Sequence, residues 1–134
     1  MPNKKGFTAI ELIIVIVAIV LIGSLLAIAF SGEIKGSFTT APPTIPAGSD
    51  STFVYTVTQT WVGQTRPKAG REITFRVAPA GTVITISPTT DNSNALGEIT
   101  VTVTPHADYR GGGNIWAKDV KSGEEDSPVH FTVN

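Results

Sequence analysis

The 134-residue chain contains no cysteine, which excludes a disulfide framework and any site that needs a thiolate as metal ligand or nucleophile. Basic residues are not in excess either: 10 Lys and Arg stand against 11 Asp and Glu, and the formal net charge is −1. Proteins bind nucleic acid mainly through clustered positive charge. We therefore expect no nucleic acid as a specific ligand.

Histidine is almost absent, and neither of the two histidines has a partner at motif spacing. His130 stands between two apolar residues and should face away from a core, while His106 follows a proline at an expected turn. The acidic run 124–126 lacks the spacing of a calcium loop and is predicted to be a solvated turn. Trp61 and Trp116 are expected to be core or sheet-face aromatics. With no Ser/His/Asp arrangement visible, we predict no metal, no cofactor and no enzymatic activity.

Hydrophobicity is concentrated near the N-terminus. An apolar run of 22 residues extends from Ala9 to Phe30, and as a helix it would be about 33 Å long, enough to span a bilayer core. Lys4 and Lys5 precede the run and favour a cytoplasmic N-terminus. The sequence thus predicts a basic leader over residues 1–6 and a single transmembrane-length helix over residues 7–35.

The next segment, residues 36–51, is rich in Pro, Thr and Ser. Its three prolines disfavour a helix and favour extended backbone, so we predict a linker. The simplest interpretation of this linker is a solvated spacer. Threonines among prolines are also candidates for O-glycosylation, and the candidates are Thr39, Thr40 and Thr44.

Residues 52–134 alternate apolar and polar side chains. Ile73, Phe75 and Val77 share one face of a strand, and the same period recurs in residues 97–104 and 127–133. Further strands are expected at Thr52–Val62, Val83–Ser87 and Asn114–Val120, with turns such as "DYRGGG" and "KSGEEDSP" between segments. About six or seven short strands predict an antiparallel sandwich. The expected fold class is therefore α+β, with one long helix followed by this sandwich. Because the linker separates the two parts, a fragment from about Ser49 to Asn134 is expected to fold without the helix.

Two parts of the chain, the sandwich region and the N-terminal region, each resemble a known family. The segments "KAGREITFRV", "TTDNSNALGEITVTVT" and "IWAKDV" are similar to bacterial immunoglobulin-like domains of the invasin type, which implies an Ig-like sandwich. The stretch "KKGFTAIELIIVIV" resembles the class III signal of type IV pilins and pseudopilins, on Gly6, Phe7 and Glu11. This second resemblance implies that a prepilin peptidase cuts between Gly6 and Phe7, with methylation of the new N-terminus, and that the helix forms a filament core.

The carboxylate of Glu11 is the unusual group in the apolar run, because a charge in a membrane helix costs about 2.5–3.5 kcal/mol. Cleavage would place a positive amine on Phe7, and Glu11 of a neighbouring subunit could pair with it during assembly. The alternative is that Glu11 reaches the headgroups from near the helix end. Mid-helix, Gly23, Ser24 and Ala27 suggest either close helix packing or local melting, or simple tolerance of small residues.

Three functions follow from these observations. The leading one is the structural subunit of a type IV pilus-like filament, a homo-oligomer that also meets the prepilin peptidase and the pilus assembly machinery. Such a chain would lie in the cytoplasmic membrane before assembly and in an extracellular filament afterwards. The alternatives are a pseudopilin or minor pilin of a secretion or DNA-uptake system, and a membrane-anchored Ig-like adhesin.

Overall fold

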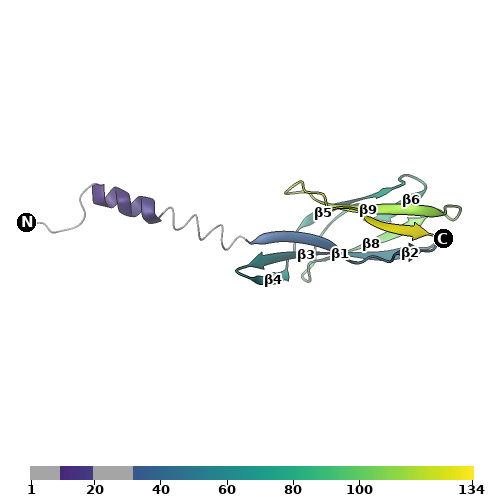
Figure 1. The fold of residues 1–134 in the computed structure, drawn as a ribbon, viewed down its shortest axis with the longest axis horizontal. Coiled ribbons are helices and arrows are strands. Elements are labelled where there is room, and N and C mark those ends of the chain that lie inside the picture. The colour runs from purple at the N-terminus through teal and green to yellow at the C-terminus, as the bar shows by residue number, and fades with distance from the viewer. Residues whose placement is uncertain (1–9, 20–31) are drawn as a thin grey trace, which may run out of the picture. The chain divides into compact units, whose positions relative to one another are not determined.

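The computed structural model describes residues 10–19 and 32–134. Residues 10–19 form a helix, drawn in purple in Figure 1, which includes Glu11 and exposes apolar side chains such as Ile10 and Ile19. In the part of the chain that is described, no helix is long and apolar enough to cross a membrane.

The predicted transmembrane-length helix over residues 7–35 is wrong. Helix is present only at residues 10–19 of the described ranges, and strand β1 (Glu33–Thr40) begins where the long helix was expected to continue. The reason is a period of two that follows the apolar run: Ile34 and Phe38 pack against the core, while Lys35 points to solvent. Over the residues that the structure describes, the fold class is accordingly an all-β sandwich with one short helix, not α+β. The predicted placement in a membrane and then in a filament depended on the long helix and is corrected with it.

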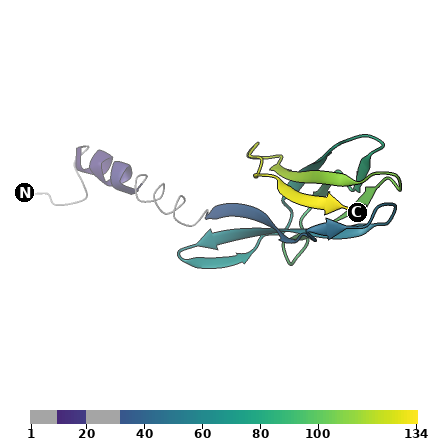
Figure 2. The ribbon, with the colours of Figure 1, turned by 45° about the vertical axis from the view of Figure 1, so that its right-hand side comes forward.

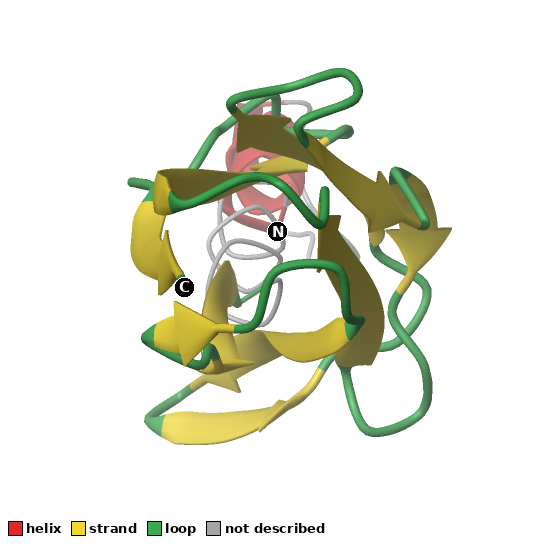
Figure 3. Cartoon of the chain, turned by 90° about the vertical axis from the view of Figure 1, so that its right-hand side faces the viewer, coloured by secondary structure: helices red, strands yellow, loops and turns green. Residues whose placement is uncertain are grey.

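The described residues contain ten strands in two sheets, which Figure 3 shows end-on. The first sheet has the order β1-β3-β8-β6, with β4 paired to β3, and the second has the order β2-β10-β9-β5-β7. Besides β1, the strands are β2 (Thr44–Ile45), β3 (Ser51–Trp61), β4 (Gln64–Pro67), β5 (Glu72–Ala78), β6 (Ile84–Ser87), β7 (Thr90–Asn92), β8 (Glu98–Pro105), β9 (Gly111–Asp119) and β10 (Val129–Val133). Figure 2 shows the same sandwich turned by 45°.

The core between the sheets is built from the inward faces of alternating strands. Its centre is aromatic: Phe53 of the first sheet and Phe131 of the second are fully buried, with ring centroids 5.5 Å apart. Phe38, Tyr55 and Phe75 extend this cluster with centroid separations of 5.0–6.1 Å. Edge-to-face aromatic pairs contribute about 0.5–1.5 kcal/mol each beyond the burial of their area, so the cluster is a main link between the sheets.

The strands predicted from alternation are present as β3, β5, β6, β8, β9 and β10. The segment predicted to be a linker instead contributes β1 and β2 to the sandwich. β2 runs parallel to the C-terminal strand β10, and its Ile45 is only 1% exposed. A strand of two residues, of which only Ile45 is buried, suffices here because backbone hydrogen bonds flank the pair, from Thr132 N to Pro43 O and from Asn134 N to Ile45 O.

The glycine run 111–113, predicted to be a turn, is the first part of β9. Gly113 pairs with Phe131 across β9 and β10, and a Cβ atom at Gly113 would lie 2.5 Å from that ring. Glycine at this position therefore makes room for the aromatic ring on the neighbouring strand.

Candidate functional site

The outer face of the second sheet carries a strip of aromatic, basic and amide side chains, which we call the aromatic–basic strip (Arg76, Asn114, Trp116, Glu125 and His130). Arg76 and Trp116 lie opposite each other on β5 and β9, and the guanidinium carbon is 3.8 Å from the centroid of the indole. The same guanidinium donates two hydrogen bonds to Glu125, of 2.7 and 2.8 Å. These bonds raise the pKa of Arg76 and lower the pKa of Glu125.

The strip continues to the C-terminal strand. Asn114 and His130 are paired across β9 and β10, with 3.2 Å between Nδ1 of the histidine and Oδ1 of the asparagine. The outer face of the first sheet differs, since its outward positions on β3 and β8 are mainly threonines: Thr52, Thr56, Thr100, Thr102 and Thr104. Trp and Arg dominate binding energy at protein interfaces, whereas Thr is under-represented. The strip is therefore the better candidate for a contact surface.

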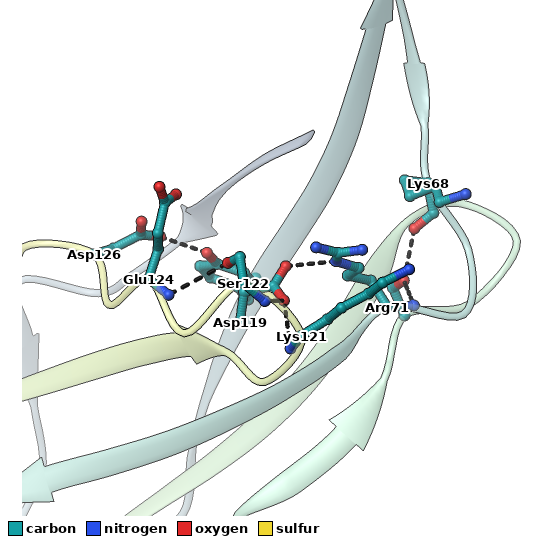
Figure 4. Close-up of polar contacts among 9 residues, drawn as sticks. Lys68, Arg71, Asp119, Lys121, Ser122, Glu124 and Asp126 are labelled. Carbon is teal, nitrogen blue, oxygen red and sulfur yellow. Dashed lines mark hydrogen bonds and ion pairs between the residues drawn. The ribbon is translucent and has the colours of Figure 1, made fainter. Parts of the chain in front are cut away.

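A second candidate site is a cleft of about 460 Å³. Its lining comes from the segment 68–72, from the end of β7 and from the turn after β9. Arg71, which lines the cleft, donates a hydrogen bond of 2.5 Å from Nε to Oδ2 of Asp119, and the two side chains are only 13% and 15% exposed (Figure 4). Because both side chains are largely buried, this ion pair holds the Arg71 guanidinium in one position at the wall of the cleft.

Ser93 holds the segment that carries Arg71. Its hydroxyl donates to the Lys68 carbonyl oxygen at 2.6 Å and accepts from the Arg71 backbone N–H at 3.0 Å. Its backbone N–H donates to the Arg71 carbonyl, and its carbonyl accepts from the Gly70 N–H. Ser93 is buried, at 5% exposure, and these four hydrogen bonds satisfy it while they fix residues 68–71.

Asp119 is fixed in the same way from the other strand. Its Oδ1 accepts hydrogen bonds from the backbone N–H groups of Lys121 and Ser122, at 2.9 and 3.1 Å. Partial burial acts to raise the pKa of Asp119, but the bonds from Arg71, Ser122 and Lys121 outweigh it, so the pKa lies below its ordinary value. The carboxylate is thus ionised at neutral pH and orients the guanidinium.

Asp119→Asn is expected to lower the free energy of unfolding at pH 7 by about 1.5–3 kcal/mol, because hydrogen bonds to a charged acceptor are lost. Since the folded-state pKa of Asp119 is depressed, its contribution is fully present above the unfolded value, near 3.8, and is lost as the pH falls through the folded-state value. Urea unfolding of wild type and variant at pH 7 and at acid pH should therefore show a difference that shrinks in acid. The exposed Asp108→Asn serves as control, and a gap that does not change with pH would contradict this role.

The structure leaves most of the predicted site residues untested. Gly6, Phe7, Gly23, Ser24 and Ala27 lie outside the described residues. Glu11 lies in the helix of residues 10–19, but its expected partner, the Phe7 amine, does not belong to the described part.

The three threonines proposed for O-glycosylation are exposed and lie in strands of the sandwich. Thr39 and Thr40 are in β1, and Thr44 is in β2. The Thr39 hydroxyl is 2.7 Å from that of Thr56 on the adjacent strand β3. Their glycosylation stays a prediction.

The remaining sequence candidates lie at the surface or in the strip. His106 is exposed, and its Nδ1 accepts a hydrogen bond from the Asp108 N–H. Of the acidic run, Glu125 bonds to Arg76, and Asp126 accepts a hydrogen bond from the buried Tyr55 hydroxyl. Burial, followed by this bond to Asp126, raises the pKa of Tyr55. Within residues 10–19 and 32–134, no three His, Asp or Glu side chains are grouped closely enough to hold a metal ion.

The sequence did not reveal the cleft. Ser93 lies 22 residues and Asp119 lies 48 residues after Arg71. Only the pairing of β5 with β7 and β9 brings the three together. The alternation around β5 does place Arg76 on the outward face, but the stacking on Trp116 depends on the register between β5 and β9.

No protein-family model and no curated protein matches the chain. Several solved structures are similar in fold, among them these three. A C-terminal fragment of intimin, in complex with the intimin-binding domain of the translocated intimin receptor, matches 75% of this chain with a TM-score of 0.53 and 20% identity. The D0-D1 domain of intimin matches 72% with a TM-score of 0.51 and 19% identity. The adhesin InvE of Yersinia pseudotuberculosis matches 77% with a TM-score of 0.52 and 18% identity.

These likenesses establish the fold, an Ig-like sandwich of the kind found in bacterial adhesins. The matched parts are 32%, 48% and 32% of the neighbours' own chains, so this chain spans about a third to a half of their length. The resemblance to type IV pilins is overturned, because the neighbours are Ig-like adhesin domains and the described helix is short. The class III signal and the prepilin peptidase as partner lose their support with it.

Proposed function

We propose that the chain is a non-catalytic adhesion module, an Ig-like domain that holds a partner molecule on the outer face of its second sheet. The observation that carries this proposal is the aromatic–basic strip. Trp116 and Arg76 are the residue types that supply most of the energy at protein interfaces, and they are stacked at 3.8 Å on a rigid sheet. Because Glu125 fixes the guanidinium from one side, little side-chain entropy is lost on binding.

The fold supports the same function by analogy. Intimin was solved with its receptor, and InvE is named as an adhesin, so the Ig-like sandwich of this chain belongs to an architecture used for attachment. Fold alone does not determine function. The proposal therefore depends on the strip, which can be altered without touching the core.

Attachment of producing cells tests the proposal. Cells from which the chain is deleted should attach less to uncoated, collagen-coated and mucin-coated glass than wild-type cells, on at least one of these surfaces, and the returned wild-type chain should restore attachment. Each hot-spot truncation costs about 2 kcal/mol or more. Cells that carry the Arg76→Ala, Trp116→Ala double variant should therefore behave like the deletion.

The matched control lies on the opposite sheet. Thr100→Ala with Thr102→Ala changes two outward threonines of β8 and should leave attachment at the wild-type level. Equal amounts of folded chain are verified with Fab fragments raised against residues 32–134. Full attachment of the deletion would overturn the adhesion function, whereas full attachment of the strip variant alone would overturn the assignment of the surface.

A further inference from the structure

The cleft beside Arg71 contains a guanidinium that is held on one side and open on the other. Asp119 engages Nε only. The terminal nitrogens Nη1 and Nη2 have no hydrogen-bond partner among the described residues. Among those same residues, every fully buried side-chain nitrogen does have a partner. Both terminal nitrogens of Arg71 must therefore keep surface that solvent or a ligand can reach. Their end-on fork matches the two oxygens of a carboxylate.

Two lysines share this cleft with Arg71. Lys68 and Lys121 both line it, and Figure 4 shows the Lys121 side chain extending toward the Lys68–Arg71 segment. Neither ammonium group forms an ion pair with the residues that the structure describes. Three cationic groups around one concave site, of which only Arg71 is paired, create a local positive potential on a chain whose net charge is −1.

The rest of the lining is not suited to a bare polyanion. Glu72 contributes a carboxylate and Asn92 an amide, while Ala69 and Val120 contribute apolar surface. A second negative charge on a ligand would be repelled by Glu72, whereas hydroxyl groups could donate to it and accept from Asn92. The volume of about 460 Å³ is within the range of small-molecule sites and exceeds the needs of a single carboxylate side chain.

We propose that the cleft binds a carboxylate-bearing sugar. The carboxylate accepts two hydrogen bonds from the terminal nitrogens of Arg71, with Lys68 and Lys121 adding long-range attraction. The ring lies against Ala69 and Val120, and its hydroxyls reach Glu72 and Asn92. The hydrogen bonds of Ser93 with residues 68–71 and of Asp119 with the Arg71 guanidinium hold the arginine in place before the ligand binds. This site is separate from the aromatic–basic strip, so it stands or falls independently of the adhesion function.

Binding of D-glucuronic acid and N-acetylneuraminic acid to the full chain, measured by NMR titration, tests the proposal. The amide signals of Ala69, Val120 and Lys121 should shift on addition of at least one acid, and the neutral sugar D-glucose should leave them unchanged. Arg71→Lys keeps the charge but loses the fork, so affinity should fall about tenfold or more. Arg110→Lys, an equally conservative change at an exposed arginine, should bind like wild type.

A second variant guards against a fold defect at Arg71. Lys68→Gln with Lys121→Gln alters two side chains outside the Arg71–Asp119 pair and should weaken binding and flatten its dependence on salt. The proposal would be overturned by no shift with either acid, or by equal affinity in the Arg71→Lys chain. Tighter binding of sulfated heparin oligosaccharides or of poly-glutamate peptide than of both acids would also overturn it, in favour of a polyanion or an acidic-peptide site.

Discussion

A fragment of residues 32–134 is expected to unfold cooperatively like the sandwich of the whole chain, whereas a fragment of residues 49–134 is expected to be largely unfolded. The shorter fragment lacks β1 and β2, and each belongs to a different sheet. It therefore loses one strand from each of the two sheets that enclose the core.

The size of this loss follows from what the two strands bury. Ile45 is 1% exposed, and Phe38 contacts the rings of Phe53, Tyr55 and Phe75. Removing one such side chain costs about 2–5 kcal/mol, and a domain of this size is stable by only about 5–15 kcal/mol. The loss of both, together with the backbone bonds that join β2 to β10, consumes most or all of that stability.

Circular dichroism and urea unfolding of the two fragments measure the difference. An intermediate fragment, residues 41–134, keeps β2 and lacks β1, and it should be less stable than residues 32–134 but more stable than residues 49–134. A cooperative transition in the shortest fragment with the midpoint of the longest one would contradict the role of both strands.

This expectation reverses the one drawn from the sequence alone, in which a fragment from about Ser49 folds by itself, because β1 and β2 both lie before that boundary. The prolines and threonines of residues 36–51 are typical of a linker, and β2 is a pair of residues too short to show a period. Its stability comes from the parallel pairing with β10, which joins residues almost 90 positions apart. By contrast, β5 and β8 each bury every second side chain, so a local pattern suffices to predict them.

The strand β1 was obscured for a different reason. Its inward positions are Ile34, Gly36 and Phe38, so the middle position carries no side chain to continue the apolar period. A Cβ atom at Gly36 would overlap the Tyr55 ring, which occupies that place in the structure. The candidate sites show the same limit, because Arg71 meets Asp119 and Arg76 meets Trp116 only through the register of β5 with β9.

Gly113 should tolerate a side chain less well than its neighbour Gly112 in β9. Gly113→Ala is expected to destabilise the domain by about 1–3 kcal/mol, because the new methyl group would lie 2.5 Å from two carbons of the Phe131 ring and 3.1 Å from Ile84. All three residues are buried, so none can move into solvent. A loss of this size lowers the melting temperature by about 4–8 °C per kcal/mol in a domain of about 100 residues.

The neighbouring position provides the control. A Cβ atom at Gly112 meets only the ring of His130, at 2.9 Å, and this exposed side chain can rotate away. Gly112→Ala should therefore be close to neutral, or slightly stabilising because it restricts the unfolded chain. Equal melting temperatures for the two alanine variants would contradict the packing argument.

A double-mutant cycle separates steric overlap from a general effect of alanine on the strand. Phe131→Leu alone leaves part of the central aromatic site empty and should destabilise the domain. Combined with Gly113→Ala it should cost less than the sum of the two single changes, by about 0.5–3 kcal/mol, since the smaller side chain leaves room for the methyl group. Strict additivity would mean that the two positions do not interact, and Gly113 would then be required for its backbone alone.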